Sequence, residues 1–211
     1  MPSEHELQRE QLVERIRAST QIEDARILAA FARVPRHLFL PSAQGALAYE
    51  DRALPLAEGQ TVSQPSMIAI MLSELGCERN QRALEVGAGS GYAAALLGQL
   101  VREVYAVEIL PALAALASAN LKRSGASNVH VSQGDGSFGL AAHAPYDRIL
   151  VSAAPSEVPS TLLEQLASDG KIAIPVGDTH NQTLLLGEKT RGGELRWRRS
   201  VPCIFVPLVS E

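Results

Sequence analysis

Three glycines at alternate positions, Gly87, Gly89 and Gly91, separate an apolar run from an alanine-rich run in the segment LEVGAGSGYAAALL, residues 84–97. A glycine-rich bend between a strand and a helix lets a ligand approach the backbone closely, and the start of the helix offers free N–H donors. The glycine spacing differs from the GxGxxG of dinucleotide-binding folds, and no Lys-Ser pair follows as in a P-loop. The bend therefore indicates a ligand site without naming the ligand.

Acidic residues follow at the ends of the apolar runs. Glu85 precedes the bend, and Glu108 ends the run EVYAVEI, 21 residues after Gly87, where an acid commonly binds ribose hydroxyls. Asp135, next to Gly136 in VSQGDGSFG, is suited to accept a hydrogen bond from an exocyclic adenine amino group. Each match is weak alone, but their order and spacing predict a nucleoside at the ends of three neighbouring strands.

The elements that must position these residues alternate along the chain. Short apolar runs predict strands at 82–86, 103–107, 128–132, 148–152 and 171–176, and helical periodicity predicts helices at 67–75, 92–100, 112–123 and 160–167. This alternation predicts an α/β protein with a central, mostly parallel, twisted sheet and helices on both faces. Two apolar runs separated by the turn Arg191-Gly192-Gly193 favour an antiparallel hairpin at the C-terminal edge.

The first sixty residues have a different character. Apolar residues recur at helical spacing until Val34-Pro35, which predicts a helical N-terminal cap. Residues 49–64, YEDRALPLAEGQTVSQ, show no sustained period and are predicted to form a long ordered loop rather than a helix or strand. Long loops inside compact domains are often functional.

Composition excludes several classes of protein. The net charge of −4 supplies no basic field that would attract nucleic acid. The sequence contains no uninterrupted run of eighteen apolar residues, so it does not suggest a membrane span. Cys77 and Cys203 stand far apart, without a CxxC pair or clustered histidines, so we expect neither a disulfide framework nor a metal site. The N-terminus is charged and lacks the apolar core of a signal peptide. We therefore expect a cytoplasmic protein, and the basic run RWRRS at 196–200 indicates a solvated strand face.

The residues also match a known family. The chain resembles the Rossmann-like methyltransferases that use S-adenosylmethionine, and among them it closely resembles the protein-L-isoaspartate O-methyltransferase family. The resemblance spans nearly the whole chain and is carried by VPRHLFLP (34–41), AYEDRALPL (48–56), GQTVSQPSM (59–67), ALEVGAGSGYAAAL (83–96), GDGSFG (134–139), APYDRILVSAAPSEVP (144–159), GKIAIPVG (170–177) and FVPLV (205–209). GQTVSQPSM discriminates best, since many methyltransferases share the glycine bend.

The resemblance implies a single Rossmann-like methyltransferase domain over 1–211, with a helical cap and active-site loop at 1–65, a cofactor-binding core at 66–180 and a hairpin with edge strands at 181–211. It implies that Ser63 is the catalytic residue. It also implies contacts with S-adenosylmethionine, or its product S-adenosylhomocysteine, by Gln60, Thr61, Val62, Ser63, Glu85, Gly87, Gly89, Gly91, Glu108, Ile109, Asp135 and Gly136. Two departures stand out: the family usually has a threonine or serine at Ala88 and often a larger side chain at Ser66.

The implied reaction transfers a methyl group to the free carboxylate of an L-isoaspartyl residue in a damaged protein or peptide, and the ester then closes to a succinimide. We expect no nucleic-acid, membrane or obligate protein partner. A carboxylate with a reference pKa of ~4 arrives ionised, so no general base is needed. Other interpretations stay open: Ser63 as an N-cap of the next helix, Glu85 as a buried acid, a different acceptor, or a non-catalytic binding module supported only by Ala88.

Overall fold

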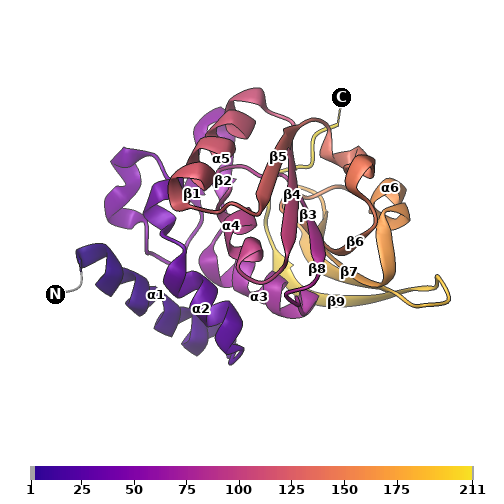
Figure 1. Cartoon of the computed structure of the whole chain (residues 1–211), viewed down its shortest axis with the longest axis horizontal. Helices are drawn as coiled ribbons and strands as arrows, with labels where there is room; N and C mark the ends of the chain where they lie inside the picture. The colour runs from indigo at the N-terminus through magenta and orange to yellow at the C-terminus, as the bar shows by residue number, and fades with distance from the viewer. Residues whose placement is uncertain (1–2, 211) are drawn as a thin grey trace.

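The computed structural model describes residues 3–210 and begins with two helices, α1 (Glu4–Thr20) and α2 (Ala25–Arg33) (Figure 1). Ser3 and Glu6 form a capping box at α1, in which Ser3 Oγ accepts from the Glu6 N–H at 3.3 Å. The side chain of Asp24 caps α2, and the helix ends before Val34-Pro35. The predicted helical start of the chain is confirmed.

Within residues 3–210, seven strands form one sheet in the order β5-β4-β3-β6-β7-β8-β9. Neighbours from β5 to β7 run parallel, and β8 is antiparallel to both β7 and β9. The strands are β3 (Arg82–Val86), β4 (Glu103–Glu108), β5 (Val129–Gln133), β6 (Tyr146–Val151), β7 (Leu166–Gly177), β8 (Gln182–Lys189) and β9 (Leu195–Cys203). The mostly parallel sheet and the antiparallel C-terminal edge are confirmed.

The strand order creates a switch point at β3. The chain adds β4 and β5 on one side of β3, then crosses back to add β6 and β7 on the other side. In such sheets, ligands bind outside the carboxyl ends of the strands where the winding direction reverses. The glycine bend at Gly87 follows β3, so the topology places it at this point.

Helices cover the two faces of the sheet unequally. Alternate residues of β3 divide between two buried clusters, with Ala83 in the first and Leu84 in the second. The first cluster contains side chains of α1 to α5, whereas Leu162 of α6 packs in the second. The remaining helices are α3 (Pro65–Leu75), α4 (Tyr92–Gly98), α5 (Pro111–Ser124) and α6 (Ser160–Glu164). Helices on both faces are confirmed, and the face that carries α6 is the more thinly covered.

The structure corrects the predictions for residues 160–167 and 49–64. The helix predicted at 160–167 ends at Glu164, and Leu166 already pairs with Tyr146 as the start of β7. Pairing with a neighbouring strand here overrides a weak local helical pattern. The loop at 49–64 contains a short antiparallel pair, β1 (Leu54–Pro55) with β2 (Thr61–Val62), that local periodicity does not reveal.

Short 3-10 turns complete the chain: η1 (Arg36–Phe39), η2 (Ser42–Leu47), η3 (Ala57–Gly59), η4 (Gly136–Phe138) and η5 (Ala141–His143). Among the described residues, no helix is both long and apolar enough to cross a membrane. The division of the chain into parts at 1–65, 66–180 and 181–211 stays a prediction, and residues 1, 2 and 211 lie outside the described residues.

Candidate active site

The glycine bend joins β3 to α4 through left-handed backbone. Gly87 has φ 86° and Gly89 has φ 54°, a conformation that glycine adopts without steric cost. The Gly87 N–H donates to the Val107 carbonyl oxygen at 2.9 Å, which ties the bend to β4. Gly91 has another role: a Cβ there would lie 3.1 Å from Leu121 Cγ, so its small size lets α4 pack against α5.

Glu108 holds the bend from the end of β4. Its Oε2 accepts from the Gly89 N–H at 2.8 Å and its Oε1 accepts from the Leu110 N–H at 3.0 Å. The residue is 6% exposed, yet each carboxylate oxygen has a second lone pair. The carboxylate can therefore accept hydrogen bonds from a diol while it keeps both backbone contacts.

A cavity of about 420 Å³, here called the nucleoside cavity, opens beside the bend. This volume lies in the usual range for small-molecule sites. Apolar side chains of Val86, Val107 and Leu208 line it. The predicted cofactor contacts that also line it are Gln60, Thr61, Gly87, Gly89, Glu108, Ile109 and Gly136.

The third predicted strand end reaches the nucleoside cavity through Gly136. A Cβ at Gly136 would lie 2.5 Å from Val86 Cγ1, so only glycine lets the backbone pass this close. Asp135 Oδ1 accepts from the Ser137 N–H at 2.8 Å and caps the turn. Neither Asp135, Val62 nor Gly91 is among the residues that line the nucleoside cavity, so a role of Asp135 toward adenine stays a prediction.

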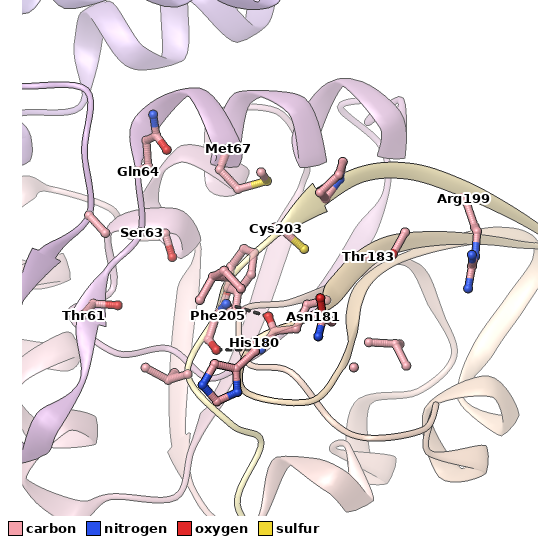
Figure 2. Close-up of a pocket in the computed structure, with 18 residues that line it drawn as sticks. Thr61, Ser63, Gln64, Met67, His180, Asn181, Thr183, Arg199, Cys203 and Phe205 are labelled. Carbon is pink, nitrogen blue, oxygen red and sulfur yellow. Dashed lines mark hydrogen bonds between the residues drawn. The ribbon is translucent and has the colours of Figure 1, made fainter.

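Ser63 lines a second, larger cavity of about 970 Å³ (Figure 2). Thr61, Ser152 and Val206 line both cavities, which therefore adjoin. Figure 2 shows the Ser63 hydroxyl directed toward the larger cavity, and within residues 3–210 no hydrogen bond from this hydroxyl is found. A hydroxyl that faces the larger cavity is thus available to a ligand.

The alternative role of Ser63 as a helix cap is wrong. The N-cap residue of α3 is Gln64, and its side chain makes no capping hydrogen bond. The Asp51 side chain supplies the capping hydrogen bond instead, because Asp51 Oδ1 accepts from the Ser66 N–H at 2.8 Å. The Gln64 side chain also donates to the Asp51 carbonyl oxygen at 3.1 Å. The loop around Asp51 therefore fixes the start of α3 and leaves the Ser63 side chain unengaged.

Arg36 ties this loop to the backbone of Ser63. The residue is 0% exposed, and its guanidinium donates to four carbonyl oxygens, those of Ala48, Glu50 and Arg52 at 2.9 Å and that of Ser63 at 3.3 Å. Its Cζ lies 5.6 Å from the Tyr92 ring centroid, a cation–π contact. Burial lowers the pKa of Arg36, and the negative charge of Asp51 opposes this. A buried cation therefore organises the segment that leads into Ser63.

Glu85 lies behind the junction of the cavities. It is 1% exposed, and its Oε1 accepts from the Ser152 hydroxyl at 2.9 Å. Within residues 3–210, Oε2 has no hydrogen-bond partner. Burial raises the pKa of Glu85 to about 8, against the hydrogen bond from Ser152. Glu85 also lines a space of about 30 Å³ with Ser63 and Gly89, which is large enough for one water. This position agrees better with a contact between Glu85 and the cofactor through a water molecule than with a direct contact.

The sequence did not predict several residues that line or support the site. Ser152 lines both cavities, and the segment at 206–209 forms a wall of the nucleoside cavity. Ala154 holds this segment, since its N–H donates to the Val206 carbonyl oxygen at 2.8 Å and its own carbonyl oxygen accepts from the Leu208 N–H at 2.9 Å. The apolar FVPLV gave no signal of this, whereas the arginine inside the apolar VPRHLFLP could have indicated a buried charge.

The family model and the relatives that match this chain carry the same description. A family model described as protein-L-isoaspartate(D-aspartate) O-methyltransferase matches residues 7–211. A Methanopyrus kandleri protein named protein-L-isoaspartate O-methyltransferase is 49% identical over 207 residues, which cover 96% of this chain and 92% of the relative. An Aeropyrum pernix protein of the same name is 48% identical over 204 residues, covering 95% of this chain and 78% of the relative.

Solved structures agree in fold. One named protein-L-isoaspartate O-methyltransferase superposes with a TM-score of 0.85 at 29% identity, covering 96% of this chain and 66% of that chain. Another, from Plasmodium falciparum, is described as a putative protein of the same type in complex with S-adenosyl-L-homocysteine. Its TM-score is 0.84 at 24% identity, with 95% of this chain and 98% of that chain covered.

Proposed function

Because the chain belongs to the protein-L-isoaspartate O-methyltransferase family, we propose that it transfers the methyl group of S-adenosylmethionine to the free carboxylate of L-isoaspartyl residues in damaged proteins and peptides. The observation that carries this is the unengaged Ser63 hydroxyl in the larger cavity, which adjoins the nucleoside cavity. Two adjoining cavities suit a transfer between two bound molecules.

The residues of the nucleoside cavity fit S-adenosylmethionine. Val86, Val107 and Leu208 offer apolar walls to the adenosine, and Glu108 would accept hydrogen bonds from the ribose hydroxyls. The glycine bend would let the methionine part lie against the backbone near Gly87. When bound, S-adenosylmethionine supplies an electrophilic methyl group on a positively charged sulfur. The lost hydroxyl at Ala88 would remove one hydrogen bond, worth about 1 kcal/mol, and would weaken binding without abolishing it.

The larger cavity would hold the acceptor. An isoaspartyl carboxylate with a reference pKa of ~4 is ionised at neutral pH, so the site needs no general base. Ser63 would donate a hydrogen bond to this carboxylate and hold one oxygen toward the nucleoside cavity. Alignment of this kind, with exclusion of water, can contribute on the order of 7–11 kcal/mol. The neighbouring backbone nitrogen would then attack the carbonyl carbon of the methyl ester. The amide proton and the methoxy group leave together as methanol, and the product is a succinimide, which starts repair.

A cytoplasmic location is part of the proposal. It is supported by Cys77 and Cys203, which are both buried and free of disulfide bonds. The net charge of −4 supports damaged proteins rather than nucleic acid as the partner.

A matched pair of peptides tests the acceptor. The protein is incubated with S-adenosylmethionine labelled on the methyl group and with two peptides that differ only in one isoaspartyl or aspartyl residue. We expect label in the isoaspartyl peptide alone, released as methanol when the ester decays. Equal labelling of both peptides, or none, would overturn the proposed acceptor. Calorimetric binding of the cofactor without transfer to any carboxylate would instead indicate a binding module.

A further inference from the structure

The larger cavity is electrostatically one-sided. No aspartate or glutamate is among the described residues that line it, whereas Arg199 and His180 do line it. Burial raises the pKa of Cys203, another lining residue, to about 11, so the thiol is neutral at physiological pH. At about 970 Å³ the cavity is at the upper end of the range for ligand sites. It has room for more of a peptide than one isoaspartyl residue.

Arg199 differs from the other arginines of the β8–β9 hairpin and its turn. Three of them are paired with acids: Arg191 with Asp169 at 2.7 Å, Arg196 with Glu194 at 3.3 Å and Arg198 with Glu74 at 2.5 Å. Within residues 3–210, the Arg199 side chain makes no ion pair or hydrogen bond, whereas its backbone pairs with Leu185 of β8. Residues 196–199 of the run RWRRS are exposed, as predicted, and its one arginine with an unpaired side chain, Arg199, also lines the larger cavity.

Arg199 and Ser63 lie toward opposite ends of the larger cavity (Figure 2). From Arg199 to Cys203, β9 advances by four residues, or about 13 Å at the usual rise of a strand, and an irregularity in its pairing with β8 shortens this slightly. An extended peptide covers the same distance in about four residues. Because Ser63 and Arg199 line the same cavity from opposite ends, an extended peptide held at Ser63 can bring a side chain several residues away to the guanidinium.

We propose that Arg199 is a specificity-determining residue that binds an acidic side chain of the acceptor peptide, three or more residues from its isoaspartyl group. The inference rests on the proposed function. An unpaired guanidinium in a cavity without acids is complementary to a carboxylate and can bind it through two parallel N–H···O bonds. The basis of selection is thus the charge of the neighbouring sequence.

The experiment uses isoaspartyl peptides that are neutral apart from the isoaspartyl carboxylate, with one glutamate placed in turn at each position from two to six residues before or after that group. Each glutamate peptide is compared with a peptide that has glutamine at the same position. For the wild-type protein we expect glutamate at one or two positions, at least three residues from the isoaspartyl group, to lower KM about three- to fivefold relative to the matching glutamine peptide. Because an accessible ion pair is screened, this ratio should fall toward one in about 0.5 M salt.

Two variants decide whether Arg199 is responsible. In Arg199→Gln the ratio of KM for glutamine and glutamate peptides should be about one at every position. Arg198→Gln removes the same charge from the next residue, which is paired with Glu74, and should keep the wild-type ratio. If Arg199→Gln leaves the KM ratio of the two peptides unchanged, or if the wild-type ratio is one at every position, the inference about Arg199 is overturned and the proposed function still stands. If no isoaspartyl peptide is methylated, the proposed function fails as well.

Discussion

Arg36 Nη2 donates a hydrogen bond to the Ser63 carbonyl oxygen at 3.3 Å, across 27 residues of sequence. The other hydrogen bonds of the same guanidinium go to Ala48, Glu50 and Arg52, which belong to the loop that carries Asp51. Asp51 in turn caps α3 just after Ser63. The backbone on both sides of the Ser63 hydroxyl is therefore held by groups that lie outside the cavities.

Arg36→Lys should lower turnover more than cofactor binding. Lysine keeps the charge but loses the planar fork that reaches several carbonyl oxygens at once. Because Arg36 contacts the loop and Ser63 but not the nucleoside cavity, we expect kcat to fall about tenfold while the Kd for S-adenosylmethionine stays within about twofold. Methyl-transfer kinetics and calorimetry measure the two quantities.

Arg148→Lys is the matched control for Arg36→Lys. Arg148 is also buried, and its guanidinium donates to the carbonyl oxygens of Gly76 and Asp147, away from Ser63. Both variants should lower the melting temperature, but Arg148→Lys should keep the wild-type kcat. Equal losses of kcat in the two variants would show that Arg36 acts only through general stability.

Ser63→Ala should keep cofactor affinity and lower kcat by about 100-fold, since a single well-placed hydrogen-bond donor contributes on this scale. The hydroxyl makes no hydrogen bond within the described residues, so its removal should leave the melting temperature nearly unchanged. Ser73→Ala, at an exposed position of α3, serves as the control. A Ser63→Ala protein with wild-type kcat would remove the serine from the mechanism.

Glu108→Gln should weaken the binding of S-adenosylmethionine by about tenfold or more. The amide has a single acceptor oxygen, whereas the carboxylate accepts from both Gly89 and Leu110 with one oxygen each. Isothermal titration with S-adenosylhomocysteine measures the change. Glu103→Gln, at the other end of β4, should bind the ligand as the wild type does. An unchanged Kd in Glu108→Gln would contradict its assignment to the nucleoside.

Glu85 should make the protein less stable as pH rises. Its folded pKa of about 8 exceeds the reference value of ~4.3 for an unfolded chain, so the folded state keeps a proton that the unfolded state loses between these values. The free energy of unfolding should therefore fall as pH rises through this window and level off above it. In Glu85→Gln this part of the pH dependence should vanish, whereas a glutamine at the exposed Glu188 should leave it unchanged. Urea unfolding at a series of pH values measures the effect, and parallel profiles for wild type and Glu85→Gln would contradict it.

Local sequence patterns predicted the parts of the fold that local chemistry determines. Glycines with positive φ, an acid at the end of β4 and alternating apolar runs are each visible within a few residues, and they gave the sheet and most of the nucleoside cavity. The proposed catalytic role of Ser63 came from the family resemblance alone, because a serine before an apolar run favours a helix cap by itself.

The features that sequence reasoning missed depend on contacts between distant residues. The pairing of Leu166 with Tyr146 shortened α6, and the contact of Ala154 with the segment at 206–209 built a wall of the cavity. Arg36 and Ser152 act through partners 27 and 67 residues away. No local period encodes such contacts. The orientation of Arg199 likewise follows from the register of β9 against β8, which the sequence did not specify.

The nucleoside cavity takes its walls from segments spread over most of the chain, with Gln60, Gly87, Glu108 and Leu208 all contributing. A partly unfolded molecule lacks one or more of these walls and cannot hold the cofactor. Mass action then adds the free energy of cofactor binding to the intact fold alone. Resistance of this protein to proteases should therefore rise with the concentration of S-adenosylmethionine.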